Sequence, residues 1–344
     1  MAPPANQSPR AGTRQLGTTE LLSSAIGFGC SRVGGVSAAG PKRTQVVKLL
    51  HEALESGINF FDTADAYARG DSEHVLGEAF QHKRDRVILA TKGGYIFEER
   101  VVTASPLQPA RSVFDKIRGK VRQTLGAPAE FSRQNFAREY LTRAVEGSLR
   151  RLRTDYIDLY QLHAPRTVDA QSGEAIDTLQ RLQQQGKIRY FGVGLESLGD
   201  VPLWLGYSEL ASLQLPFGLL DMEATRTVLP AIADKGRALI ARGVYGGGLL
   251  KADLDEAWLK SVTPKWERIA EFHRIAARTG RPIYEVALHY VLQRPEVALV
   301  LLGMTSPAQL RSNLDCLRQG PLDDETRQAV DSVGDRFPLP NPAP

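Results

Sequence analysis

The 344-residue sequence has only two cysteines, and Cys30 and Cys316 stand far apart with no Cys-x-x-Cys spacing. Such a pair argues against a zinc site and against a disulfide framework, so we expect a reducing compartment. No stretch approaches the ~20 continuous apolar residues of a membrane-spanning helix. The first residues also lack the apolar core of a secretion signal. The sequence therefore predicts a cytoplasmic protein with no membrane association and no bound metal.

An excess of one charge is also nearly absent, because 43 basic residues stand against 39 acidic ones, a net charge of +4. The basic residues are spread along the chain instead of gathered in one patch. This spread predicts an ordinary, mildly basic surface and no nucleic-acid binding. The sequence shows no internal repeat and no coiled-coil pattern, and it does not indicate an oligomeric state.

A Gly-x-Gly-x-x-Gly motif followed by a helix is missing as well. The stretch IGFGCSRVGG, residues 26–35, contains Gly-x-Gly, but no helix opens directly behind it. Instead, short apolar runs alternate with helical patterns along the chain. Eight strands, each followed by a helix, predict an α/β fold, a single-domain (β/α)8 TIM barrel. The expected strands are Ala25–Phe28, Ile58–Phe61, Val87–Ala90, Tyr156–Leu162, Ile188–Val193, Ala211–Gln214, Ala238–Ala241 and Val297–Leu302.

The expected helices are 43–56, 72–81, 137–152, 174–185, 198–205, 224–235, 265–293 with a break at 280–282, and 307–317. A last helical pattern covers 323–333. The barrel domain is expected at 14–336, between a disordered tail at 1–13 and a Pro-rich tail at 337–344. A long, polar and basic insertion at 95–136 follows the third strand. Loops of this length are often substrate lids, although this insertion could also have no role in function.

Four ionisable side chains stand at or just beyond the ends of predicted strands. Asp62 directly follows Ile58–Phe61, and Tyr67 lies five residues further on, in the loop. Lys92 and His163 follow the third and fourth strands. Because the carboxyl ends of barrel strands meet at one rim, we expect these four groups to converge where such folds place their chemistry.

The four groups suit the interconversion of a carbonyl and an alcohol. A phenol has a pKa near ~10, so Tyr67 exchanges protons poorly at neutral pH unless that pKa is lowered. We expect the Lys92 ammonium, paired with Asp62, to lower it by stabilising the phenolate. His163 can donate a hydrogen bond to the carbonyl oxygen. Each residue taken alone could instead be structural, as a surface Tyr, a turn-capping Asp or a core His.

The stretch GINFFDTADAYARGDSEHVLGEAF resembles the signature of the aldo-keto reductases. The likeness continues through VILATKGG, SLRRLRTDYIDLYQLH and LLGMTSPAQLRSNLD, and it covers nearly the whole chain. The resemblance implies a barrel that binds NADP(H), with NAD(H) as the alternative, without a Rossmann fold. It also implies a catalytic tetrad of Asp62, Tyr67, Lys92 and His163. The implied activity is hydride transfer between that cofactor and a small-molecule aldehyde, ketone or corresponding alcohol.

The resemblance further implies a cofactor-binding set, from which this chain departs in places. Gly194 and Leu195 replace the usual Ser-Asn pair, and Arg242 stands where an aromatic ring commonly stacks on the nicotinamide. No Lys or Arg stands in the segment expected to meet a 2′-phosphate except Arg311, so a weak preference for NADP is expected. The implied set is Gln214, Arg242, Gly243, Gly246, Gly247, Gly248, Gly303, Thr305, Gln309 and Asn313.

Two other functions remain open. One is a redox-neutral lyase or Schiff-base enzyme with Lys92 as nucleophile, although a neighbouring Asp62 opposes the neutral amine that this chemistry needs. The other is a regulatory protein that binds the cofactor as a sensor. The substrate cannot be read from the sequence. Its pocket is expected to be shaped by the loop after Phe28, by Tyr95 and the 95–136 insertion, and by Ala164.

Overall fold

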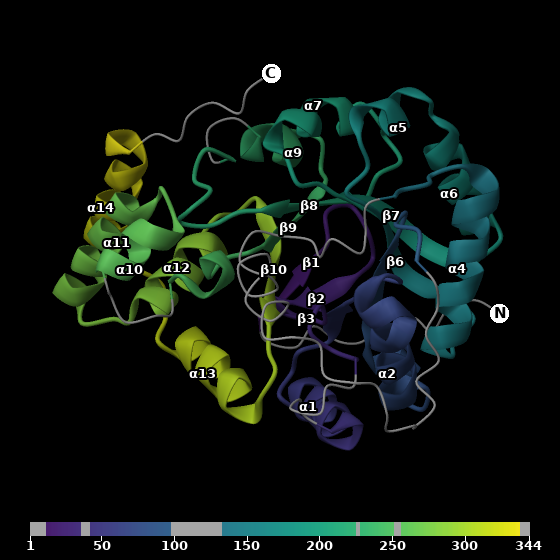
Figure 1. Ribbon diagram of the computed structural model, residues 1–344, viewed down its shortest axis with the longest axis horizontal. Helices are drawn as coiled ribbons and strands as arrows, with labels where there is room; N and C mark the ends of the chain where they lie inside the picture. The colour runs from purple at the N-terminus through teal and green to yellow at the C-terminus, as the bar shows by residue number, and fades with distance from the viewer. Residues whose placement is uncertain (1–11, 36–41, 98–132, 225–227, 251–255, 338–344) are drawn as a thin grey trace.

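The computed structural model describes residues 12–35, 42–97, 133–224, 228–250 and 256–337. Eight parallel strands close into a barrel in the order β10-β3-β4-β5-β6-β7-β8-β9, with helices around it (Figure 1). The predicted single-domain (β/α)8 barrel, with its insertion after the third barrel strand, is confirmed. No helix in these described ranges is both long enough and apolar enough to cross a membrane.

Every predicted barrel strand is present, with ends shifted by three residues at most. Strands of this kind are buried on both faces, which is why they read as short continuous apolar runs. The strands are β3 (Ile26–Gly29), β4 (Phe60–Asp62), β5 (Ile88–Gly93), β6 (Ile157–His163), β7 (Ile188–Gly194), β8 (Ser212–Pro216), β9 (Ala238–Arg242) and β10 (Val297–Gly303).

The helices follow the predicted pattern, and the expected break occurs at Gly280, which adopts a left-handed φ of 70°. They are α1 (Arg43–Glu55), α2 (Asp71–Phe80), α4 (Arg138–Leu152), α6 (Glu174–Gln184), α7 (Val201–Trp204), α9 (Leu229–Asp234), α11 (Trp266–Thr279), α12 (Ile283–Leu292), α13 (Pro307–Arg318) and α14 (Asp324–Arg336). The sequence did not predict the short helices α5 (Thr167–Gln171) and α10 (Glu256–Val262).

A hairpin that the sequence did not predict closes one end of the barrel. Its strands β1 (Thr13–Gln15) and β2 (Leu22–Ser24) pair antiparallel. Between them, Leu16 and Leu21 pack into the barrel interior with Phe60, the first residue of β4. The hairpin therefore covers the amino-terminal end of the strands and leaves the carboxyl end open.

The predicted tails fall largely at residues 1–11 and 338–344, which lie outside the described residues. Thr13 already belongs to β1, and the carbonyl oxygen of Phe337 accepts a hydrogen bond from the buried Arg268. The described residues thus begin two residues before the predicted first residue of the domain and end one residue after its predicted last residue.

The two ends of the insertion are joined at the open end of the barrel. Tyr95 and Gln134 form an antiparallel bridge, and the Gln134 amide donates hydrogen bonds to the carbonyl oxygens of His163 (3.0 Å) and Ala164 (2.8 Å). Residues 98–132 lie outside the described ranges, so the substrate lid stays a prediction.

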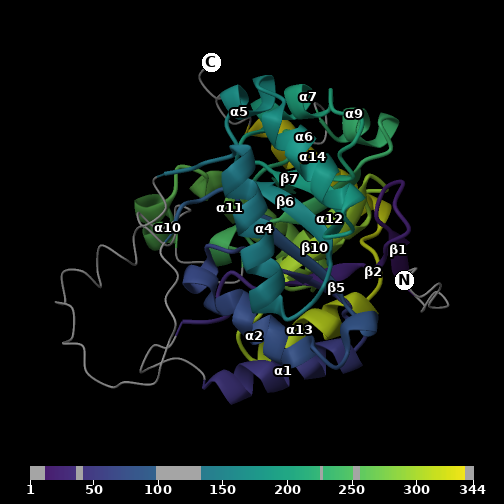
Figure 2. The ribbon, with the colours of Figure 1, turned by 90° about the vertical axis from the view of Figure 1, so that its right-hand side faces the viewer.

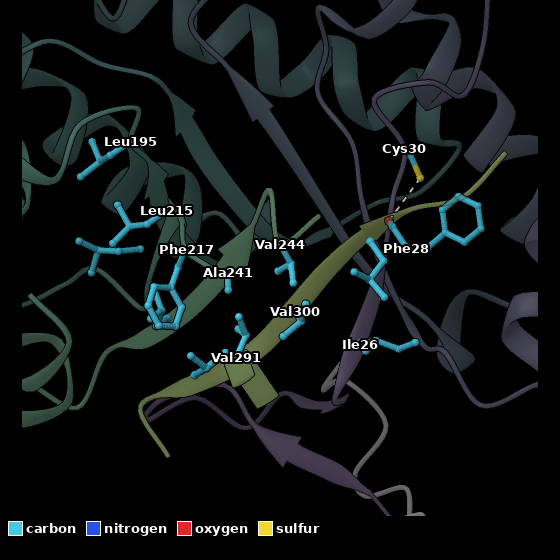
Figure 3. Packing of buried hydrophobic residues seen from close by; sticks show 14 of the residues in the cluster. Ile26, Phe28, Cys30, Leu195, Leu215, Phe217, Ala241, Val244, Val291 and Val300 are labelled. Carbon is cyan, nitrogen blue, oxygen red and sulfur yellow. Dashed lines mark hydrogen bonds between the residues drawn. The ribbon is translucent and has the colours of Figure 1, made fainter. Parts of the chain in front are cut away.

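An apolar layer between the strands and the surrounding helices holds the barrel together. The close-up in Figure 3 shows part of this layer. Ile26 and Phe28 of β3 and Val300 of β10 belong to it, and so do Leu215 of β8 and Phe217 just beyond that strand. These side chains are essentially inaccessible to solvent, so their burial supplies the main favourable term for folding.

Helices α2 and α4 pack against each other (Figure 2), and Gly77 of α2 lies at their contact. A Cβ atom built on Gly77 would lie 2.3 Å from the Arg151 carbonyl oxygen and 2.8 Å from the Leu152 carbonyl carbon. A buried ion pair between Arg151 and Glu73 (2.6 Å) ties the same helices together. Helix α2 directly follows the loop that contains Tyr67, so this contact fixes the position of that loop.

Gly77→Ala should destabilise the fold by about 1–3 kcal/mol, because the methyl group meets backbone atoms that cannot rotate away. Gly334→Ala in α14 is the matched control. There the new Cβ would meet only the flexible side chain of Met222, at 3.3 Å and beyond. This substitution should therefore stabilise the fold by about 1 kcal/mol, because Ala favours a helix more than Gly does. Urea unfolding of both variants tests the contact. Equal stabilisation by the two substitutions would contradict the close approach of α2 and α4.

Candidate active site

A cavity of about 430 Å³ opens at the carboxyl end of the barrel strands. All four predicted catalytic residues line it, so the structure brings them together as expected. Its lining consists of Gly29, Ser31, Asp62, Ala66, Tyr67, Ala68, Lys92, Tyr95, His163, Gly194, Glu196, Gln214, Arg242, Gly243, Leu301 and Gly303. Ala164, which was expected to shape the pocket, is not among these lining residues.

A buried ion pair forms the floor of the cavity. The Lys92 ammonium donates to Asp62 Oδ1 at 2.5 Å and to the Thr63 carbonyl oxygen at 2.9 Å. Burial lowers the pKa of Lys92, but the charge of Asp62, its hydrogen bond and the neighbouring Tyr67 together outweigh burial, so the net shift is upward. Lys92 is therefore a charged ammonium at neutral pH.

Tyr67 lies beside this ammonium, with the Lys92 Nζ atom 5.3 Å from the centre of its ring. Burial raises the pKa of the Tyr67 phenol, and the charge of Lys92 offsets only part of this rise. The net pKa is above its ordinary value, so the expectation that Lys92 would bring it below that value is wrong. The sequence places the ammonium correctly but does not show how completely the phenol is removed from water. Tyr67 is consequently a neutral phenol, a proton donor, at neutral pH.

The loop after Tyr67 bends sharply into α2. Ala68 and Arg69 both adopt left-handed backbone angles, with φ of 50° and 56°, and Gly70 follows with a φ of 89°. Asp71 holds the start of the helix, since it accepts a hydrogen bond from the Gly35 amide (2.8 Å) and pairs with Arg43 (2.6 Å). This turn keeps Tyr67 at the cavity while α2 packs against the barrel.

His163 contacts two aromatic rings at the cavity. Its imidazole makes edge-on contacts with Tyr67 (5.7 Å between centroids) and with Tyr95 (4.8 Å). Burial lowers the pKa of His163 well below its ordinary value, and the charges of Lys92 and Arg242 lower it further. The imidazole is thus neutral, and it can orient an oxygen atom by donating its single N–H proton.

Two glutamines complete the surroundings of Asp62. The side-chain amides of Gln161 (3.2 Å) and Gln214 (3.0 Å) both donate to Asp62 Oδ2. Gln214 was expected to bind a cofactor, and Gln161 was not singled out from the sequence. Its position two residues before His163 on the same strand puts both on one face, and this was the available signal.

The departures at positions 194 and 195 have a clear structural meaning. Leu195 is buried beside Leu215 in the apolar layer (Figure 3), so its side chain does not reach the cavity. Its carbonyl oxygen accepts a hydrogen bond from Arg242 (3.0 Å), which also pairs with Glu196 (2.8 Å). Gly194 leaves one wall of the cavity without a side chain.

The remaining residues of the implied cofactor set lie mostly beyond the cavity. Gly243 and Gly303 line it, whereas Gly246–Gly248 form a short 3-10 turn in which all three glycines have positive φ. Thr305 and Gln309 are exposed and bonded to each other, through Thr305 N and Gln309 Oε1 at 2.8 Å. Asn313 is fully buried, and its side-chain oxygen accepts a hydrogen bond from Tyr245 (2.9 Å).

The site can transfer a proton from a neutral phenol next to a fixed positive charge. It offers an oxygen atom two neutral hydrogen-bond donors, Tyr67 and His163, over the Lys92–Asp62 pair. Among the described residues, no group of three or more His, Cys, Asp or Glu side chains could hold a metal ion.

Proteins similar to this chain include oxidoreductases and reductases. A family model described as the Aldo/keto reductase family matches residues 25–335. The chain is 30% identical to the uncharacterized oxidoreductase YqkF of Bacillus subtilis over 327 residues, 93% of this chain and 95% of the relative. It is 27% identical to the NADH-specific methylglyoxal reductase of Escherichia coli over 320 residues, 88% of this chain and 92% of the relative. The holo form of the aldo-keto reductase AKR11C1 from Bacillus halodurans superposes with a TM-score of 0.73 and 30% identity, over 93% of this chain and 95% of that one.

The electrostatics of His163 can be measured without any substrate. Its ring should protonate well below the ordinary pKa of 6.5, and Lys92→Met should raise that pKa because a neighbouring positive charge is removed. NMR titration of the histidine ring protons, assigned with His163→Asn, tests both statements. Lys187→Met is the control, since Lys187 pairs with Glu146 on the outside of the barrel. A His163 signal that titrates near 6.5 in the wild type would refute the assignment.

Proposed function

Since the chain belongs to the aldo/keto reductase family, we propose that it is an NAD(P)H-dependent oxidoreductase that interconverts an aldehyde or ketone with the corresponding alcohol. The observation that carries the proposal is the convergence of four groups in one cavity. They are a neutral Tyr67, a neutral His163 and the buried Lys92–Asp62 pair. The Escherichia coli relative, a methylglyoxal reductase specific for NADH, supports both the carbonyl substrate and the cofactor class.

The residues around the cavity fit a nicotinamide dinucleotide. Gly194, Gly243 and Gly303 line it without side chains, and a Cβ at Gly243 or Gly303 would meet nothing within 4 Å. Such bare backbone allows a flat ring and a phosphate chain to approach closely. Beyond it, α13 opens at its N-cap Ser306, and the amino-terminal end of a helix favours a phosphate.

The proposed mechanism follows from the protonation states. In reduction, Tyr67 gives its proton to the carbonyl oxygen, which His163 orients by a hydrogen bond. The Lys92 ammonium stabilises the phenolate that remains, and Asp62 holds the ammonium in place. In oxidation, the Tyr67 phenolate takes the proton from the alcohol. The chemistry supplied by a bound nicotinamide dinucleotide is hydride exchange with the carbonyl carbon.

The protonation of Lys92 bears on the Schiff-base alternative. A lysine nucleophile must lose its proton, whereas Asp62 holds the pKa of Lys92 above its ordinary value. The ammonium also donates to the Thr63 carbonyl oxygen, which further stabilises the charged form. The surroundings of Lys92 therefore favour the hydride-transfer mechanism.

Tyr67→Phe should lower turnover by ~10²–10⁴-fold, the usual size of a general acid contribution, and leave the cofactor dissociation constant nearly unchanged. Cofactor absorbance with a panel of aldehydes, ketones and alcohols measures the first quantity, and calorimetry measures the second. Tyr156→Phe is the control, because Tyr156 stacks with Arg84 away from the cavity. If Tyr67→Phe keeps turnover within a few-fold of wild type, Tyr67 is not the proton donor.

The cofactor preference is proposed to be weak, with NADPH favoured over NADH by no more than about tenfold, or ~1.4 kcal/mol. A 2′-phosphate needs a cation to offset its loss of hydration, and Thr305 and Gln309 offer only neutral groups. Arg311 is exposed on α13. If it reaches the phosphate, Arg311→Ala should weaken NADPH selectively, whereas the control Arg318→Ala on the same helix should not. Dissociation constants at one ionic strength decide this, and a wild-type preference above a hundredfold would contradict it.

A further inference from the structure

Asp62 is held from three other strands, and its two oxygens have different partners. Oδ1 accepts from Lys92 on β5. Oδ2 accepts from Gln161 on β6 and Gln214 on β8, and the Gln214 amide also lies 3.3 Å from Gln161 Oε1. The exposed fraction is 4% for Asp62, 0% for Gln161 and 2% for Gln214. Solvent therefore cannot replace these hydrogen bonds.

The layering of the barrel brings these three side chains together. In barrels of this type, each interior layer takes its side chains from alternate strands. Asp62, Gln161 and Gln214 come from β4, β6 and β8, which alternate in the closed strand order. Leu301 on β10 lines the same cavity and supplies the remaining alternate strand. Three of the four strands thus contribute polar groups, at a depth where barrels usually hold apolar ones.

Glycines stand on the intervening strand β7 beside both glutamines. Gln161 is paired in register with Gly192 of β7, and Gln214 with Gly194 of the same strand. β4 and β8 lie opposite each other in the eight-strand order, so the Gln214 side chain reaches across the barrel to Asp62. An interior of apolar residues lies below, including Phe60 and Leu159.

The two amides limit how Asp62 can act on Lys92. With Oδ2 occupied by two donors, only Oδ1 is directed at the ammonium. The ammonium has three N–H donors, of which Asp62 and the Thr63 carbonyl oxygen take two. The third N–H donor of the ammonium is left for the Tyr67 hydroxyl. We propose that Gln161 and Gln214 are positioning residues, which fix Asp62 so that the Lys92 ammonium stays directed at the Tyr67 phenol.

The proposal predicts the direction of a change in proton transfer. Without the amide donors, more of the Asp62 charge acts on Lys92, and the ammonium stabilises the phenolate less. The charged groups that act on the Tyr67 phenol are Lys92 of β5, Asp62 of β4 and Arg242 of β9, while the neutral His163 of β6 touches its ring. Only the balance between Asp62 and Lys92 changes, so the pH at which Tyr67 ionises should rise.

Gln161 offers the cleaner test, because it is absent from the cavity lining while Gln214 is part of it. Gln161→Met keeps the volume and removes the donor. The midpoint of the pH profile for alcohol oxidation should rise by roughly one unit, and turnover below that midpoint should fall about tenfold. The cofactor dissociation constant should stay as in wild type. Gln161→Asn, with an amide too short to reach, should shift the midpoint in the same direction.

Ser212→Ala is the matched control. Ser212 is buried on β8 near Gln214, and its hydroxyl has no hydrogen-bond partner among the described residues. Ser212→Ala should keep the wild-type pH profile for alcohol oxidation. Thermal melting identifies any variant that does not fold, and Gln161→Asn then carries the test. A wild-type midpoint and turnover in folded Gln161→Met would overturn the inference.

The inference rests on the proposed function, and a substrate-free measurement separates the two. Tyr67 ionisation can be followed by ultraviolet absorbance of tyrosinate, as the difference between a protein and its Tyr67→Phe counterpart. If the wild type oxidises no alcohol but Gln161→Met still raises this ionisation midpoint, the function is wrong and the positioning role stands. If oxidation is observed and Gln161→Met moves neither midpoint, the positioning role fails alone.

Discussion

The buried ion pair of Lys92 and Asp62 is the interaction on which the rest of the site depends. Removing two charges from water is costly unless their remaining hydrogen-bonding capacity is satisfied. Here a backbone carbonyl and two side-chain amides, from Gln161 and Gln214, satisfy it within the barrel interior. The pair is therefore a property of the closed barrel, because its partners come from strands on several sides.

Burial and this fixed positive charge together determine the states of the neighbouring groups. Burial lowers the pKa of His163 and the charge of Lys92 lowers it further, whereas for Tyr67 the charge offsets part of the rise in pKa that burial causes. Two neutral donors over one buried cation are the arrangement on which the proposed protonation of a carbonyl oxygen and stabilisation of the phenolate rest. Glycines at positions 194 and 243 leave the surroundings of these groups open to a flat ring.

Much of the fold could be predicted from the sequence, and the misses have physical reasons. The eight barrel strands are buried apolar runs, so they stand out from the amphipathic helices between them. The hairpin of β1 and β2 has strands of three residues each, too short to show an alternating pattern. Helices α5 and α10 are likewise short, at five and seven residues, and are barely longer than one or two turns.

The sequence by itself determined the barrel, its open end and the four catalytic candidates, because strand ends and motif spacing are local properties of the chain. Only the tertiary structure decided the pKa of Tyr67, which depends on how completely surrounding strands and loops exclude water. It also decided that Gln161 and Gln214 share one oxygen of Asp62, and that Leu195 turns away from the cavity. Those contacts join residues about a hundred positions or more apart, which no local pattern records.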